Sequence, residues 1–278
     1  MGIKRQLALL LCLILTAGLA FTTIQPADAA ASGQETSTKT AIDKISQVFE
    51  AAELFYEELK EAIAEEVESA ESEEDTGMSE VEAGIKQLRG YANQLDGLLG
   101  ELNGLPDKAD DSIGRTVLAL REYLTILRNM AADMAQLGQY SVELYNAVII
   151  MDGMDEDPDS FSAMAEELLL VTGQSLGMLE KITPPDYLKI SHGDVITRMK
   201  EFNEFGADFY YAAELNDPLR IYSCMYRMGR IVRLFERYEA NLEADMNLQS
   251  EQMETRINGS VKLLHDELEH NIGLLKAA

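Results

Sequence analysis

The fold is decided by residues 185–215, PDYLKISHGDVITRMKEFNEFGADFYYAAEL, where an apolar or small residue recurs every three or four positions. These positions are Leu188, His192, Val195, Met199, Phe202, Gly206, Phe209 and Ala213. An α-helix turns once in about 3.6 residues, so the spacing places all of them on one side of a helix. Such a helix has to cover its apolar side with other helices.

The same spacing runs along most of the chain and predicts six helices. Their approximate ranges are 39–70, 79–103, 112–151, 160–182, 185–215 and from 218 towards the end. The third would be roughly 60 Å long at about 1.5 Å per residue, which favours an elongated molecule. We therefore expect an all-α fold, an elongated helical bundle with a four-helix up-down core and an N-terminal helical hairpin.

Breaks between the predicted helices carry turn residues. Pro184 and Pro185 end one helix, and Asp217 and Pro218 cap and begin another. Asn258-Gly259-Ser260 is expected to kink or interrupt the last helix. The break at 102–111 separates an N-terminal hairpin, 39–103, from a helical bundle, 111–278. The hairpin either extends the bundle or packs against the C-terminal segment.

The N-terminus has the layout of a cleavable secretory signal. Lys4 and Arg5 precede an uncharged apolar run, and Ala27-Asp28-Ala29 supplies small residues for cleavage. We expect a signal peptide over 1–29 and a flexible leader over 30–38. The alternative is an uncleaved anchor, although the run is shorter than the roughly 20 residues of a membrane span. The expected location is secreted or extracytoplasmic, without a membrane span after cleavage.

The charge balance limits the partners. The chain has 49 acidic and 23 basic residues and a formal net charge of −26. Such a chain repels nucleic acid and anionic lipid. Cleavage would leave Cys224 as the one cysteine, so no intrachain disulfide could form. Cys224 lies on an apolar stripe, where a thiol behaves as a small apolar residue.

One acidic loop resembles the calcium loop of an EF-hand. Its ligand positions would be the side chains of Asp155, Asp157, Asp159 and Glu166, with the carbonyl of Phe161. The loop lies between two predicted helices. It departs from the motif at Ser160, where the sharp turn favours glycine. The alternative is an acidic turn in which Asp157, Asp159 or Ser160 caps the next helix, and calcium is the one cofactor that the sequence suggests.

The three histidines lie in two parts of the chain. His192 lies on the apolar stripe, which predicts a buried side chain that is hydrogen-bonded to a neighbouring helix. Near the C-terminus, Glu267 and His270 form a single Glu-x-x-His pair, whereas a di-iron bundle needs two. We expect His265, His270 and their acidic neighbours Asp266, Glu267 and Glu269 to form a solvated polar face.

Aromatic residues gather at the turn between the fifth and sixth predicted helices. They are Phe205, Phe209, Tyr210, Tyr211, Tyr222 and Tyr226. Two interpretations stay open at this stage. The residues form either a packed end of the bundle or an exposed patch for a partner or an apolar ligand.

The segment Ile182-Thr183-Pro184-Pro185-Asp186-Tyr187-Leu188, followed by His192, resembles a turn of extracytoplasmic helical-bundle proteins of bacteria. In those proteins a helix ends at a Pro-Pro pair and the next helix carries a histidine. The resemblance covers about 179–240. It implies a helical fold and an extracytoplasmic location, and it implies no activity.

These patterns favour an exported, non-enzymatic helical-bundle protein that acts in protein–protein interaction or as an envelope scaffold. Its partner would be an unidentified protein or a second copy of the chain. One alternative is a calcium- or cation-binding bundle that uses the 155–166 loop. Another is a ligand-binding or sensory-type bundle. No catalytic constellation was found in the sequence, so we do not expect an enzyme.

Overall fold

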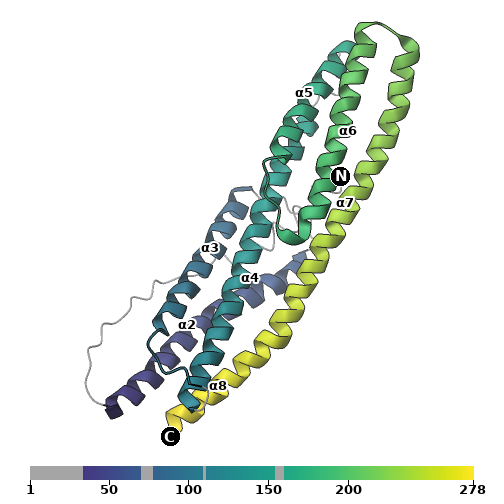
Figure 1. Cartoon of the computed structure of the whole chain (residues 1–278). Helices are drawn as coiled ribbons and strands as arrows, with labels where there is room; N and C mark the ends of the chain where they lie inside the picture. The colour runs from purple at the N-terminus through teal and green to yellow at the C-terminus, as the bar shows by residue number, and fades with distance from the viewer. Residues whose placement is uncertain (1–33, 70–77, 109–110, 154–159) are drawn as a thin grey trace. The chain divides into compact units, whose positions relative to one another are not determined.

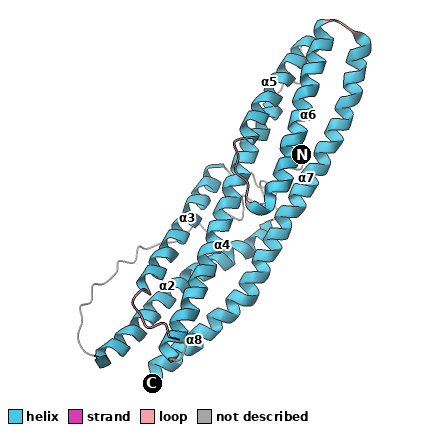
Figure 2. Ribbon diagram, in the orientation of Figure 1, coloured by secondary structure: helices cyan, strands magenta, loops and turns pink. Residues whose placement is uncertain are grey.

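A computed structural model describes residues 34–69, 78–108, 111–153 and 160–278, and throughout these residues the regular structure is helical (Figure 2). The α-helices are α2 (Gln34–Ser69), α3 (Met78–Glu101), α4 (Ser112–Ile149), α5 (Phe161–Leu179), α6 (Lys189–Glu214), α7 (Pro218–Arg256) and α8 (Lys262–Ala277). Two 3₁₀ turns, Ile150–Gly153 and Asp186–Leu188, and a π-helical turn, Ile257–Val261, lie between them. The predicted all-α helical bundle is confirmed.

The helices form two compact units, which are described separately. The central unit is Leu137–Gln249, and the terminal unit comprises the described residues up to Gln136 together with Ser250–Ala278. Both boundaries fall inside long helices, α4 and α7. None of the described helices is long and apolar enough to cross a membrane.

The terminal unit contains the predicted N-terminal hairpin. Helix α2 contacts α3 and also α8 (Figure 1). The core of the terminal unit includes Ile45, Leu59, Leu88, Leu124 and Leu127, which have no exposed surface. The contacts of α2 with α8 agree with one of the two arrangements that the sequence left open, the packing of the hairpin against the C-terminal segment. The hairpin therefore groups with part of α4 and with α8, whereas the sequence analysis placed these in a separate bundle.

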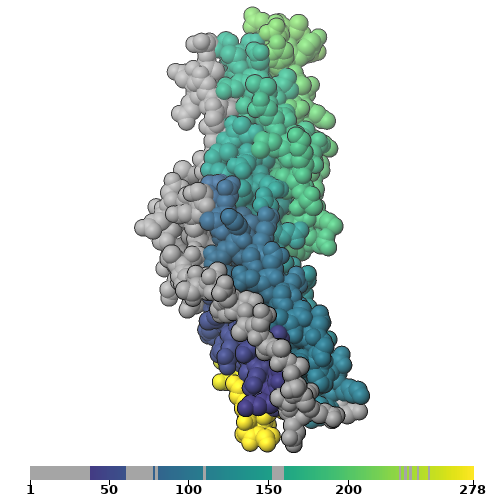
Figure 3. Space-filling model, turned by 90° about the vertical axis from the view of Figure 1, so that its left-hand side faces the viewer, coloured from purple at the N-terminus to yellow at the C-terminus, as the bar shows by residue number. Residues whose placement is uncertain are grey.

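The central unit is built around the pair of α5 and α6, which run antiparallel and adjoin each other on the face drawn in Figure 3. Gly206 lets the two backbones approach closely, because a Cβ atom there would lie 3.2 Å from the Leu169 Cα. Asn203 Nδ2 donates hydrogen bonds to Leu169 O at 3.2 Å and to Thr172 Oγ1 at 3.0 Å. The Pro184-Pro185 break is confirmed, since α5 ends at Leu179 and α6 begins at Lys189.

The turn from α6 to α7 has the predicted chemistry. Asn216 adopts a left-handed backbone with φ of 49°, a conformation common just after a helix end. Asp217 Oδ1 then accepts hydrogen bonds from the backbone amides of Leu219 at 3.1 Å and Arg220 at 3.2 Å. Asp217 therefore caps α7, and Pro218 is the first residue of this helix, as the sequence predicts.

Of two expectations about the chain ends, one needs correction and the other agrees with the structure. Helix α2 begins at Gln34, so residues 34–38 are helical, whereas the sequence analysis assigned them to a flexible leader. The interruption predicted at Asn258-Gly259-Ser260 is present as the π-helical turn. In α8, which follows this turn, the buried residues are His265, Leu268 and Ile272.

Gly114 provides a test of the packing at the start of α4. A Cβ atom at this buried position would lie 2.2 Å from the backbone oxygen of Lys108, far inside van der Waals contact. We expect Gly114→Ala to destabilise the protein by about 1–3 kcal/mol, because a backbone segment would have to move. Thermal unfolding followed by circular dichroism measures the effect.

Gly193→Ala is the matched control. Gly193 is an exposed position of α6, and a Cβ atom there would meet nothing within 4 Å. This substitution should raise stability by about 0.5–1 kcal/mol through helix propensity. Equal behaviour of the two variants would contradict the described contact.

Candidate functional site

The most distinctive surface of the central unit is the outward side of α7. Leu219 is 83% exposed, and Tyr222 and Tyr226 are each 75% exposed. Arg230 and Arg233 are also exposed. Successive members are three or four residues apart, so the five lie on one side of the helix. We call Leu219, Tyr222, Tyr226, Arg230 and Arg233 the outer stripe.

The opposite side of α7 fixes the helix to its own unit. Cys224 and Ile231 are buried. Arg227 Nη1 forms an ion pair with Asp208 of α6 at 2.5 Å, and Ser191 of α6 donates a hydrogen bond to Asp245 of α7. Because these anchors all lie away from the outer stripe, the stripe can be covered without detaching α7.

Further large apolar side chains extend the stripe at the α6–α7 turn. Tyr211 is 57% exposed, and Leu215 and Met225 are each 55% exposed. Phe205 and Phe209 are buried and stack at 5.9 Å between ring centroids. The packed-end interpretation is therefore confirmed for the two phenylalanines.

The packed-end interpretation is wrong for three of the tyrosines at this turn. Tyr211, Tyr222 and Tyr226 are exposed, because each lies on the side of its helix that faces away from the core. The exposed-patch interpretation fits these residues.

The outer stripe is basic at its C-terminal end. Arg220 forms an ion pair with Asp217 at 3.6 Å, and Arg227 is held by Asp208. Arg230 and Arg233 are exposed, and no ion pair joins them to a side chain that the structure describes.

His192 is buried at 4% exposure, as its place on the apolar stripe predicts. Its Nε2 lies 3.2 Å from the backbone oxygen of Leu179, and its Nδ1 lies 3.3 Å from Tyr140 Oη. A carbonyl can only accept, so the neutral ring carries its proton on Nε2, and the Tyr140 hydroxyl donates to Nδ1. Burial lowers the pKa of His192, and the bond to Leu179 partly offsets this. The arrangement is a hydrogen-bonded core link between α4, α5 and α6.

Most of the acidic loop that was predicted to bind calcium lies outside the described residues. Asp155, Asp157 and Asp159 lie outside the described residues, so the calcium interpretation stays a prediction. Phe161 and Glu166 are exposed on α5. Ser160 caps α5, because its Oγ accepts a hydrogen bond from Ala163 N at 3.1 Å, as the alternative interpretation of this loop allowed.

His265 does not lie on a solvated polar face, so that prediction is wrong for this residue. It is 9% exposed and stacks on Tyr56 at 4.9 Å between ring centroids. Phe49 and Tyr123 lie at 5.2 and 6.0 Å from it. Three aromatic rings from α2 and α4 thus enclose an imidazole from α8. Asp266, Glu267, Glu269 and His270 are exposed, as predicted.

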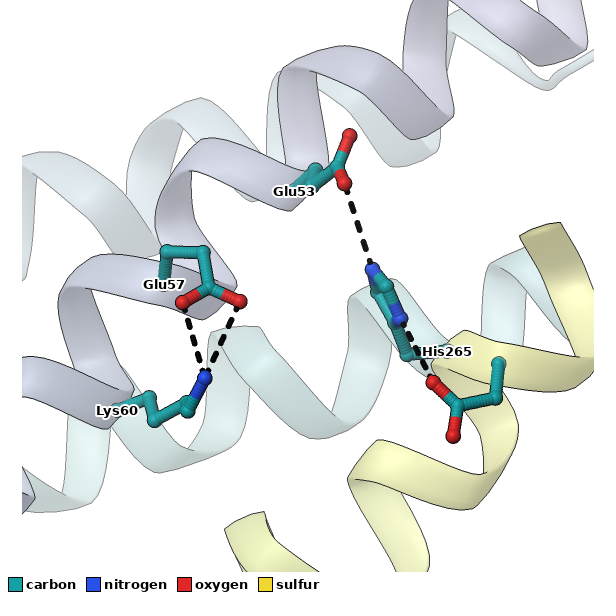
Figure 4. A network of polar contacts seen from close by, with 5 residues as sticks. Glu53, Glu57, Lys60 and His265 are labelled. Carbon is teal, nitrogen blue, oxygen red and sulfur yellow. Dashed lines mark hydrogen bonds and ion pairs between the residues drawn. The ribbon is translucent and has the colours of Figure 1, made fainter.

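Carboxylates flank the His265 ring on both sides (Figure 4). Glu53 Oε1 lies 3.8 Å from Nε2, and Asp266 Oδ1 lies 3.4 Å from Nδ1. The buried Tyr123 Oη has no hydrogen-bond partner among the described residues, and burial raises its pKa. Ring stacking therefore dominates this cluster, which joins α8 to α2 and α4. The sequence signal for it is the 4-4-3-4 spacing of Ile257, Val261, His265, Leu268 and Ile272, which places His265 on the apolar side of a helix.

Two other chemistries have little support in the described residues. No three His, Cys, Asp or Glu side chains among them are arranged to hold a metal ion. Burial raises the pKa of the Cys224 thiol, which disfavours the reactive thiolate. Both observations concern only the part of the chain that the structure covers.

Comparison with known proteins adds no assignment. No protein-family model, no curated protein sequence and no solved structure matches this chain. The resemblance to extracytoplasmic helical-bundle proteins therefore stays a prediction.

His192 should make the stability of the protein depend on pH. Because its folded pKa is lowered, the unfolded chain takes up a proton first, and stability falls as pH drops below about 6.5. We expect His192→Leu to lack this loss. At pH 5 the Tm change from pH 7.5 should differ between wild type and variant by on the order of 2–4 °C, the effect of about 1 kcal/mol.

The comparison of pH profiles isolates the imidazole. Protonation of the many surface carboxylates affects both proteins alike and cancels in the difference. A constant Tm gap between wild type and His192→Leu from pH 7.5 to 5 would contradict the described environment of His192.

Proposed function

We propose that this chain is an exported, non-enzymatic helical-bundle protein that works by binding another protein through the outer stripe of α7. Export is supported by the N-terminal signal pattern of Lys4, Arg5 and Ala27-Asp28-Ala29. The binding role is supported by Leu219, Tyr222 and Tyr226 of the stripe, whose side chains are large, apolar and highly exposed.

The composition of the stripe favours a protein partner. Tyrosine, methionine and arginine are enriched at protein interfaces, and tyrosine and arginine are prominent among the residues that dominate binding energy. Tyr222, Tyr226, Met225 and Arg230 supply these types on one surface. Scattered exposed apolar residues are ordinary in proteins, whereas Leu219, Tyr222 and Tyr226 lie on one side of a single helix, as expected of an interaction site.

Export predicts a shortened chain in the cell. The form recovered from the extracytoplasmic fraction should begin near Ala30, because the small residues at Ala27 and Ala29 fit the cleavage site. Intact mass and N-terminal sequencing measure this. Recovery of the uncut chain from the cytoplasm would contradict export and would leave the binding role to be judged by the next experiment.

Site-specific photo-crosslinking tests the binding role directly. A benzoylphenylalanine residue at position 222 should give a protein adduct in living cells, because the side chain there points at the partner. The same group at position 190 is the matched control, since Ile190 is 82% exposed on α6 and lies outside the stripe. Leu219→Ser together with Tyr226→Ser should reduce the adduct at 222 at least tenfold. Equal adducts at 222 and 190, or none at 222, would contradict the proposal.

A further inference from the structure

We infer that the outer stripe binds an acidic amphipathic helix of a partner protein, an inference that rests on the function proposed above. The stripe has two parts along α7. Leu219, Tyr222 and Tyr226 form its apolar part, and Arg230 and Arg233 form its basic part. The partner helix would place aliphatic side chains on the first part and carboxylates on the second.

The geometry of the stripe fits a helix. Its members are spaced 3, 4, 4 and 3 residues apart, the pattern of two helices packed nearly parallel or antiparallel. From 219 to 233 the stripe is about 21 Å long, at about 1.5 Å per residue. A partner helix of about four turns covers this length.

The charge of the stripe sets the sign of the partner. Residues 218–235 contain four arginines and no Asp or Glu, in a chain with a net charge of −26. Arg230 and Arg233 are exposed, whereas Cys224 and Ile231 on the inner side of α7 are buried. Guanidinium groups bind carboxylates through paired hydrogen bonds, which makes carboxylates the favoured ligands here.

Other occupants fit the stripe less well. Two copies of the stripe packed in parallel would bring four guanidinium groups together, which is unfavourable. Packed antiparallel, the two copies would offer no carboxylates to these arginines. An anionic membrane would meet the carboxylates of Glu214 and Asp217 at the α6–α7 turn and the net negative charge of the whole chain. The net charge also opposes an acidic partner at long range. At physiological salt, however, this repulsion is screened beyond about 8 Å, whereas contacts within the stripe are not.

The test uses two synthetic 21-residue helical peptides and the protein purified from its native cell fraction. Both peptides carry leucines at alternating three- and four-residue spacing. One has glutamates beside the leucines, and the other has lysines at the same positions. Fluorescence anisotropy measures their Kd values. The net charge of the protein alone favours the lysine peptide, so a preference for the glutamate peptide has to come from the local field of the arginines.

We expect the glutamate peptide to bind at least tenfold more tightly than the lysine peptide. Arg230→Glu with Arg233→Glu should reverse the order, and Tyr222→Ser with Tyr226→Ser should weaken both peptides at least tenfold. Ile190→Ser, at an equally exposed site outside the stripe, should change neither Kd. Thermal melts should match wild type for the tyrosine and Ile190 variants, because all three side chains are exposed.

Several outcomes would overturn the inference. These are tighter binding of the lysine peptide, equal binding of the two peptides, no binding of either, or insensitivity to the arginine substitutions. Binding to phosphatidylglycerol vesicles without binding to either peptide would replace the helix with a lipid surface. Self-association in sedimentation velocity without peptide binding would replace it with a second copy. If any of these outcomes is combined with a protein adduct at position 222 in cells, the proposed binding of a protein is retained, and only the inference that the partner is an acidic helix is rejected.

Discussion

Burial of one apolar side of each helix is the interaction on which the rest of this structure depends. Full burial of a leucine or phenylalanine side chain contributes about 1.5–3 kcal/mol, and the described chain has no disulfide to add to it. Leu59, Leu88, Leu124 and Leu127 have no exposed surface in the terminal unit, and Phe205 and Leu179 are equally enclosed in the central unit. The same requirement explains why side chains on the opposite side of a helix stand out when they are apolar. The exposed side chains of Tyr222 and Tyr226 do not contribute to this burial.

The apolar periodicity also sets how much of the fold could be predicted. The periodicity predicted the helices, because a 3–4 spacing repeated over several turns places the apolar residues on one side of an α-helix and of no other regular secondary structure. It placed His192 in the core for the same reason, and the bond to Leu179 O follows from the need of a buried imidazole for a partner. Asp217 and Ser160 were identifiable as caps from their residue type and position. These features depend on neighbours in sequence or on a single helix face.

The burial of His265 was missed, because its charged neighbours suggested a polar face. The spacing of Ile257, Val261, His265, Leu268 and Ile272 nevertheless places it on the buried side of the C-terminal helix. The division of the helices into two compact units could not be predicted from the sequence. Periodicity says that a face is covered but not by which helix, so long helices such as α4 and α7 can contribute to two units without any signal at the boundary.

The aromatic turn shows the difference between clustering in sequence and clustering on a surface. Successive helical residues are about 100° apart, so the adjacent Tyr210 and Tyr211 differ in exposure, one half-buried and the other exposed. Cys224 and Ile231 mark the inner side of α7, and Tyr222 and Tyr226 lie nearly opposite them. Once the inner side is fixed, the remaining aromatic and arginine side chains form a single surface with an apolar part and a basic part. In a chain with a net charge of −26, this surface combines exposed apolar side chains with exposed arginines, and the proposed partner is placed here for that reason.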